Sequence, residues 1–239
     1  MVEVLSMKNH QRWVLGYVLI LLATVLTAHW GSRAVTVMAE TRPVEGRHTL
    51  IIDPGHGGVD GGATSCTGIL ESRFNLEIGL RLEAFLQFLG YRTVMIRRED
   101  ISVYTEGETI AGKKASDLKQ RVKMVEAEND AVLLSIHQNY FPQAQYSGAQ
   151  TFYAGTSGSQ RLAKAMQTAF TRYLDPVRPR QEKKSSSVYL MEHVSCPAVL
   201  IECGFLSNPR EEALLRSADY QKKLAVIMGC SAAEYLSNT

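Results

Sequence analysis

Three unbroken apolar runs constrain the fold more than any other feature of this sequence. They read TLIID, AVLLSI and AVLI, and they begin at Thr49, Ala131 and Ala198. Apolar runs of this length without polar alternation are typical of strands buried on both faces of a parallel sheet. Such a sheet needs helices on both of its faces, so the runs predict an α/β protein.

Segments with helical periodicity lie between and around these runs. Helices are expected over 72–89, 114–128, 159–174, 211–216 and 220–236, and further strands over 91–96, 149–153 and 188–191. This alternation predicts a single-domain three-layer sandwich, with a mostly parallel or mixed central sheet flanked by helices. The 239 residues, 45% of them hydrophobic, suffice for one domain of about 190 residues and an appendage.

The appendage is an apolar amino-terminal segment at residues 13–30. It reads WVLGYVLILLATVLTAHW, contains no charged residue, and follows Lys8 and Arg12. As a helix it would extend about 27 Å, which matches the hydrocarbon core of a bilayer. We therefore expect a transmembrane signal anchor or a signal peptide, with residues 1–12 in the cytoplasm, a linker at 31–46 and a catalytic domain at 47–239 that is exported. The small residues around Val37 and Ala39 leave cleavage open.

Charge and cysteine spacing exclude two classes of function. The net charge is +2 and no dense Lys/Arg block occurs, so nucleic acid is not an expected partner. The four cysteines form no C-x-x-C pair, which argues against a thiolate zinc site.

The ends of the three apolar runs carry the candidate chemistry. The first run leads to His56, the second to His137 and the third to Glu202. Ligands of open α/β sheets bind beyond the carboxyl ends of the strands, so these side chains can converge although they are distant in sequence. Two imidazoles and a carboxylate, without clustered thiols, suit zinc.

A catalytic zinc ion usually has three protein ligands, and the sequence offers several acids for the third position. Glu71 follows the glycine-rich loop at the expected start of a helix, where the helix dipole favours a carboxylate. It competes with Asp53 and Asp60, and a first-turn acid with no metal role is an equally good reading of Glu71. Asp53 is alternatively expected to orient His56 from outside the ligand shell. The spacing of these residues in the sequence does not decide which acid is the third ligand.

Four segments stand out around these candidate residues, namely DPGHGGVDGGA from Asp53, GILES ending just after Glu71, SIHQN from Ser135 and IECGFLSNPRE from Ile201. In this order they resemble the zinc-dependent N-acetylmuramoyl-L-alanine amidases of the Amidase_3 family. The resemblance extends over about residues 49–235. It implies that His56, Glu71 and His137 are the zinc ligands, that Glu202 is the catalytic carboxylate, and that Asn139 lies at the mouth of the substrate groove.

The resemblance also implies a substrate, the peptidoglycan amide that joins N-acetylmuramic acid to L-alanine of the stem peptide. Glu202 is then expected to take a proton from a zinc-activated water and to deliver it to the leaving amine. The chain length, the amino-terminal apolar segment and the lack of appended wall-binding repeats resemble germination-specific members of the family. They imply spore-cortex maturation, in which peptide removal prepares muramic acid for conversion to muramic-δ-lactam, and a location in the forespore or spore envelope facing the cortex.

Two other functions fit parts of this pattern. A zinc carboxypeptidase or peptidase acting on wall peptides would use nearly the same ligands. A non-catalytic wall-binding scaffold would not need Glu202. Separately, the segment 99–120 is longer than the usual connection between a strand and a helix, so we expect it to bind an accessory protein or to shape the groove.

Overall fold

The computed structural model describes residues 48–174, 176 and 179–238. The predicted anchor or signal peptide at 13–30 and the linker at 31–46 lie outside these residues. Among the described residues, no helix has both the length and the apolar character needed to cross a bilayer. Residues from Val44 onward form one compact unit.

The sheet has six strands in the order β2-β1-β3-β6-β4-β5. Strands β2, β1, β3 and β6 run parallel to one another, while β4 is antiparallel to β6 and parallel to the short β5. The strand bounds are Thr49–Pro54 (β1), Thr93–Met95 (β2), Ala131–Asn139 (β3), Gln150–Tyr153 (β4), Lys183–Lys184 (β5) and Ala198–Phe205 (β6). The predicted three-layer α/β fold with a mixed sheet is confirmed.

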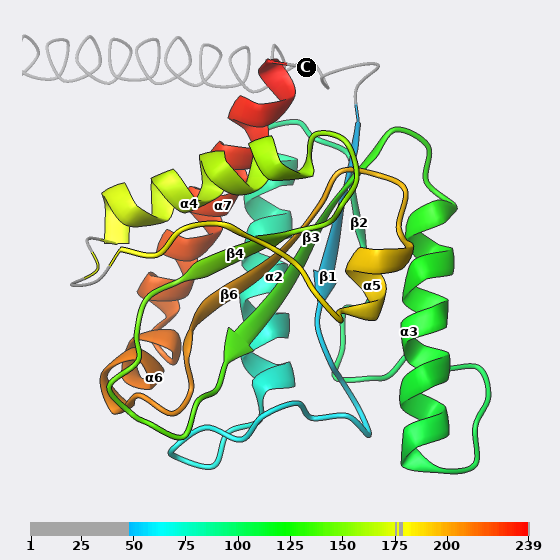
Figure 1. The fold of residues 1–239 in the computed structure, drawn as a ribbon, viewed down its shortest axis with the longest axis horizontal. Coiled ribbons are helices and arrows are strands. Elements are labelled where there is room, and N and C mark those ends of the chain that lie inside the picture. Colours follow the sequence, from blue (N-terminus) through cyan, green and yellow to red (C-terminus); the bar gives the residue numbers. More distant parts are fainter. Residues whose placement is uncertain (1–47, 175, 177–178, 239) are drawn as a thin grey trace, which may run out of the picture. The chain divides into compact units, whose positions relative to one another are not determined.

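Helices cover both faces of the sheet (Figure 1). The helix bounds are Glu71–Phe88 (α2), Ile110–Glu126 (α3), Ser159–Leu174 (α4), Tyr189–His193 (α5), Pro209–Leu215 (α6) and Ala218–Ser237 (α7). Helices α2, α4 and α7 pack together on one face, and α3 packs beside α5 on the other. The apolar runs are buried on both sides because each face of the sheet meets a helical layer.

Successive residues of β1 show this arrangement. Leu50 and Ile52 belong to the hydrophobic cluster shared with α2, α4 and α7, whereas Ile51 belongs to the cluster shared with α3 and α5. All three side chains have no exposed surface. Burying an aliphatic side chain of this size stabilises the fold by about 1.5–3 kcal/mol, which favours the aliphatic runs in the central strands.

The expected strand at 188–191 is wrong, because these residues begin the short helix α5. Leu190 and Met191 are buried in the cluster with α3, and Glu192 Oε1 accepts a hydrogen bond from Ser187 N just before the helix. A short apolar run does not distinguish a strand from one turn of buried helix, since both bury consecutive residues.

The long connection at 99–120 is also shorter than expected, because α3 begins at Ile110 rather than near Lys114. Thr109 caps the helix, and its Oγ1 accepts a hydrogen bond from Gly112 N at 3.0 Å. Threonine before a helix is a common start signal, but the charged residues that follow hide the helical period. The irregular part is therefore 99–109, and 110–120 forms the first turns of α3.

The topology brings the ends of β1, β3 and β6 to one edge of the sheet (Figure 1). Ser135 on β3 is in register with Asp53 on β1, and His137 is in register with Glu202 on β6. Residues paired in this way point to the same side of a sheet. The candidate site is therefore built at this edge.

Candidate active site

His56 lies two residues beyond β1 in a left-handed backbone conformation, with φ of 61°. Few non-glycine residues adopt this conformation, and it persists only where the surroundings hold it. Gly55 N donates to Ile136 O on β3 at 2.9 Å, and Arg121 Nη2 donates to His56 O at 2.8 Å. The strained turn directs the imidazole toward the ends of β3 and α2.

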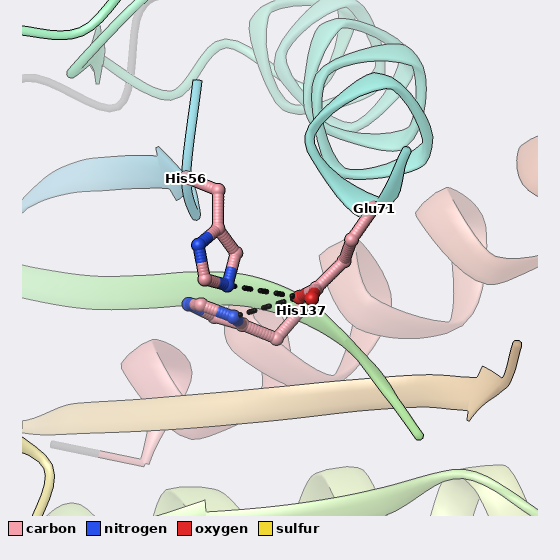
Figure 2. Close-up of side chains that lie close together, drawn as sticks. All are labelled: His56, Glu71 and His137. Carbon is pink, nitrogen blue, oxygen red and sulfur yellow. Dashed lines mark hydrogen bonds and ion pairs between the residues drawn. The ribbon is translucent and has the colours of Figure 1, made fainter. Parts of the chain in front are cut away.

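Three side chains converge at this edge (Figure 2). Glu71 Oε1 lies 3.3 Å from His56 Nε2 and 3.0 Å from His137 Nδ1. One potential ligand atom from each residue lies within 4.8 Å of the others. His56 comes from the turn after β1, Glu71 from the first turn of α2, and His137 from β3.

The donor set and its spacing fit a metal ion. Two ligand atoms bound to one zinc ion at about 2.0–2.1 Å in tetrahedral geometry lie about 3.3 Å apart, close to the two distances found here. Two imidazole nitrogens with one carboxylate oxygen also form a set that zinc accepts, with one coordination position left open. The cluster His56, Glu71 and His137 is therefore able to hold a metal ion.

Glu71 is held as a carboxylate. Its Oε2 accepts a hydrogen bond from Ala63 N at 3.0 Å, and its Oε1 accepts one from Gln138 N at 3.1 Å. Burial alone would raise the pKa of Glu71, but the hydrogen bonds from His137 and His56 outweigh it and hold the pKa far below its usual range. The helix amino terminus adds to this preference for negative charge.

Two glycines make room for the cluster. A Cβ atom at Gly55 would overlap the imidazole of His137. Gly62 has φ of 69°, and a Cβ there would lie 2.6 Å from Glu71 Oε2 and 2.8 Å from His56 Cδ2. Glycine is required at both positions because any side chain would displace a ligand.

Asp60 is the carboxylate that orients His56. Its Oδ2 lies 2.9 Å from His56 Nδ1 and 3.1 Å from Lys114 Nζ at the start of α3. Burial would lower the pKa of His56, but the hydrogen bonds and charges of Glu71 and Asp60 outweigh it and raise the pKa. A carboxylate on the outer nitrogen is the usual support of a metal-binding histidine.

Asp53 does not contact His56 as the sequence suggested. Its Oδ2 accepts a hydrogen bond from Ser135 Oγ at 2.6 Å, and its Oδ1 forms a buried ion pair with Arg121. Strand alternation explains the difference, since Asp53 points to the α3 side of the sheet, where Arg121 lies. It supports the histidine turn indirectly, because Arg121 also donates to His56 O.

Two buried arginines hold the carbonyl groups of the turn. Arg97 Nε donates to Pro54 O at 2.8 Å and its Nη2 donates to Gly55 O at 3.0 Å, while Arg121 binds Pro54 O and His56 O. Each side chain is 2% exposed. All three carbonyl groups of a turn that lacks regular pairing are thereby satisfied.

Glu202 lies beside His137 on the neighbouring strand. Its Oε2 is buried and has no hydrogen-bond partner among the described residues. Burial raises the pKa of Glu202 to about 7, with His137 and His56 opposing the rise and Glu71 adding to it. A carboxyl group with a pKa near neutrality and an unused oxygen is suited to accept and return a proton.

Asn139 ends β3, two residues beyond His137. Its backbone O accepts a hydrogen bond from Leu206 N at 2.8 Å, and it is in register with Phe205. The residue is half-buried at the same edge of the sheet as the three ligand candidates. The structure therefore groups His56, Glu71 and His137 in one cluster with Glu202 on the neighbouring strand, while Asn139 lies at the end of the strand that carries His137.

Sequence reasoning missed four supporting residues, namely Arg97, Arg121, Asn75 and Lys114. Asn75 is fully buried, and its Nδ2 donates to Gly55 O at 3.1 Å and to Glu71 Oε1 at 3.3 Å. One signal was available, because Asn75 follows Glu71 by one helical turn and must share its face. Arg121 and Lys114 gave no comparable signal, since they look like surface cations of a helix.

Hydrolases that use a single metal ion share this combination of three protein ligands and a nearby acid–base group. The comparisons with known proteins agree with that class. The family model Amidase_3, described as N-acetylmuramoyl-L-alanine amidase, matches residues 50–228. This chain therefore belongs to the Amidase_3 family of N-acetylmuramoyl-L-alanine amidases.

Individual relatives support the same assignment. The germination-specific N-acetylmuramoyl-L-alanine amidase of Bacillus subtilis is 40% identical over 185 residues, which cover 77% of each chain. The CwlD amidase of Clostridioides difficile, solved in complex with the GerS lipoprotein, matches with a TM-score of 0.77 and 36% identity over 81% of this chain and 100% of its own. An N-acetylmuramoyl-L-alanine amidase from Clostridium difficile 630 matches with a TM-score of 0.72 and 31% identity over 81% of this chain and 98% of its own.

Proposed function

We propose that this protein hydrolyses the amide bond between N-acetylmuramic acid and L-alanine in peptidoglycan, with zinc held by His56, Glu71 and His137. One observation carries the proposal. Three donor atoms at ligand spacing converge beside Glu202, whose buried Oε2 has no hydrogen-bond partner in the part of the chain that the structure describes. Family membership supports the choice of bond.

Each residue of the proposed site has a separate role. A bound zinc ion supplies a Lewis acid that polarises the amide carbonyl group and lowers the pKa of a water molecule. Glu202 accepts the proton of the attacking water and returns it to the leaving amine of L-alanine. Asn139, at the end of β3, contacts the substrate beside the reacting bond. Asp60 and Asn75 keep His56 and Glu71 in place.

The test uses the zinc-loaded domain and purified peptidoglycan. Mass spectrometry of the products should show intact stem peptides with a free L-alanine amino group. The Glu202→Gln variant should bind zinc with unchanged affinity and lose about 10²–10⁴-fold in turnover, the usual contribution of a positioned acid–base group. An exposed acid, Glu106, provides the matched control as Glu106→Gln.

Three outcomes would contradict the proposal. Shortened peptides that remain attached to muramic acid would identify a wall peptidase instead. Full turnover by Glu202→Gln would remove Glu202 from the proton-transfer role, and zinc-independent binding without any cleavage would indicate a wall-binding scaffold.

The cellular setting is a second part of the proposal. Similarity to the germination-specific amidase supports a role in the spore cortex, where peptide removal precedes muramic-δ-lactam formation. We place the catalytic domain outside the cytoplasm, anchored by residues 13–30 or released from them. Spores that lack the protein should contain cortex without muramic-δ-lactam, and normal δ-lactam content would refute this role.

An accessory protein is the third part. The CwlD amidase of Clostridioides difficile forms a complex with a lipoprotein. This chain offers two exposed apolar residues in the 99–120 segment, Ile101 in the connection before α3 and Ile110 at the first residue of α3, which are 48% and 70% exposed. We assign the 99–120 segment as the docking site. Replacing both isoleucines by serine should abolish association with a lipoprotein partner while preserving the fold, and unchanged association would exclude this segment.

A further inference from the structure

A group of exposed aromatic side chains lies directly after the strand that carries His137. Tyr140, Phe141 and Tyr146 are 50%, 44% and 38% exposed. Across the part of the chain that the structure describes, five aromatic side chains are this exposed, and three of them fall within this seven-residue stretch. We call these three residues the aromatic ledge. Single exposed aromatics are common, whereas a cluster beside a catalytic centre indicates a binding surface.

Hydrogen bonds hold the aromatic ledge in place. Phe141 N donates to Ser207 Oγ at 3.3 Å, and Asn208 Nδ2 donates to Tyr146 O at 3.1 Å. Both partners belong to the turn between β6 and α6, which lies against the loop from β3 to β4 (Figure 1). The rings are therefore presented by a loop fixed at two points, which lowers the entropy cost of binding.

The rings also pack on one another. Phe141 meets Tyr146 edge-to-face with centroids 4.8 Å apart, and Tyr146 stacks on the buried ring of Phe205 at 6.3 Å. Even with these contacts, Phe141 remains 44% exposed and Tyr146 38% exposed.

The ledge lies within reach of the reacting bond. Tyr140 follows His137 by three residues, or about 10 Å along an extended strand. Asn139, between them, is in register with Phe205, the base of the aromatic stack. A ligand whose amide bond lies at Glu202 therefore extends onto the ledge within one or two sugar units.

The chemistry of the aromatic ledge favours one of the two parts of the substrate, the glycan strand or the stem peptide. The stem peptide carries carboxylates, and a surface that binds carboxylates needs cationic side chains. Arg180 packs over the buried ring of Phe205 at 4.6 Å, and its Nε and Nη1 already donate to Ser147 O and Gln150 Oε1. Sugar rings instead present flat C–H faces that pack on aromatic rings while their hydroxyl groups stay in water, which matches amphipathic, half-exposed rings.

We propose that the aromatic ledge binds the glycan strand, on the sugars that neighbour the N-acetylmuramoyl group whose amide is cleaved. This inference rests on the proposed amidase function, since it uses the position of the scissile bond. It makes Phe141 and Tyr146 residues that determine a preference for polymeric over single-sugar substrates.

The experiment compares two substrates in the zinc-loaded enzyme. The Phe141→Ala/Tyr146→Ala variant should show about a tenfold higher KM for peptide-bearing glycan strands, as expected from the loss of one or two aromatic contacts. Its kcat/KM for a single-sugar N-acetylmuramoyl peptide should stay within twofold of the parent. Phe141→Trp should preserve the low KM. Phe88→Ala, at a 70% exposed ring on the last residue of α2, is the matched control and should change neither substrate.

Binding without catalysis separates this inference from the proposed function. Peptide-free glycan strands should bind the parent protein in a calorimetric titration and fail to bind the double variant, even if the enzyme cleaves a different bond. If the double variant unfolds, the single variant Phe141→Ala replaces it, because among the described aromatic residues the Phe141 ring packs on Tyr146 alone. Unchanged KM and glycan binding in a folded variant would overturn the inference. An equal loss of kcat/KM on both substrates would also overturn the inference. Loss of binding to a protein partner with unchanged glycan binding would overturn it as well.

Discussion

At the scale of single residues, two residues of the site adopt states that are unfavourable in free energy. His56 occupies a left-handed conformation, and Glu202 buries an oxygen that no described residue satisfies. An unsatisfied buried oxygen costs about 1–3 kcal/mol, and strained backbone adds a similar amount. Such costs are often found at functional sites, and both residues lie at the candidate metal site. Two predictions belong to this scale.

Stability should depend on pH through Glu202. Its pKa is about 7 in the folded protein, above its ordinary value of 4.5, so the folded state binds the proton more tightly. The free energy of unfolding of the metal-free protein therefore falls as pH rises from about 4.5 to 7, by up to roughly 3 kcal/mol. Glu202→Gln should be more stable than the parent at pH 8, with a smaller advantage at pH 5. Urea unfolding at both pH values measures this, and a difference independent of pH would contradict it.

Asp60 should control metal affinity through His56. Asp60→Asn keeps the shape of the side chain but removes the charge that supports His56 Nδ1. Zinc affinity should fall about 10–100-fold, the usual effect of removing such a support. Competition with a chromophoric chelator measures the dissociation constant without reference to activity. Lys114→Met, which removes only the outer partner of Asp60, should change affinity much less.

At the scale of elements, α3 is tied to the end of β1 by a buried charge network. Arg121 of α3 pairs with Asp53 of β1 and with Asp117, one turn earlier on its own helix, and its side chain is 2% exposed. The helix thus carries the guanidinium that holds the histidine turn, although none of its residues is a candidate ligand. Secondary structure alone does not reveal this coupling.

Removing Arg121 should destabilise the domain strongly. Arg121→Met leaves Asp53 as an uncompensated buried charge, which costs about 3–5 kcal/mol. Urea unfolding of the metal-free protein measures the loss, and Arg121→Met/Asp53→Asn should recover part of it. Lys222→Met breaks an ion pair whose side chains are 65% and 90% exposed, and should cost at most about 1 kcal/mol. Equal effects of the two single variants would show that the network is energetically unimportant.

At the scale of the whole molecule, metal binding and folding should be coupled. The three ligand candidates come from the turn after β1, from α2 and from β3, so the site exists only in the folded domain. A chain beginning at Val44 should fold independently, because residues 44–239 form one compact unit. Its thermal stability should therefore report zinc binding directly.

Zinc at 100 times its dissociation constant should stabilise this domain by about 2.7 kcal/mol. For a domain of this size the increase in Tm should be about 5–11 °C. Differential scanning calorimetry with zinc and then with excess chelator measures the rise and its reversal. Magnesium, which prefers an all-oxygen shell, should have little effect. A Tm that does not respond to zinc, or that responds equally in Glu71→Gln, would argue against the cluster as the metal site.

The sequence by itself determined the layered α/β fold and the edge at which the site lies. Apolar runs that end at His56, His137 and Glu202 carry this information locally, because burial on two faces and a strand end are both visible in consecutive residues. The sequence did not distinguish one turn of helix from a strand at 188–191, since both elements bury consecutive apolar residues.

Only the tertiary structure decided which acids support the cluster. Spacing favoured Glu71 as the third ligand but left Asp53 and Asp60 open as alternatives, and the fold separates the three acids by the direction of their side chains. Asp53 turns to Arg121, Asp60 to the outer nitrogen of His56, and Glu71 to the space between the two imidazoles. The physical reason is that a carboxylate acquires its role from the charges and donors that surround it. Those groups come from α2, α3 and β3, which are distant in sequence and adjacent only after folding.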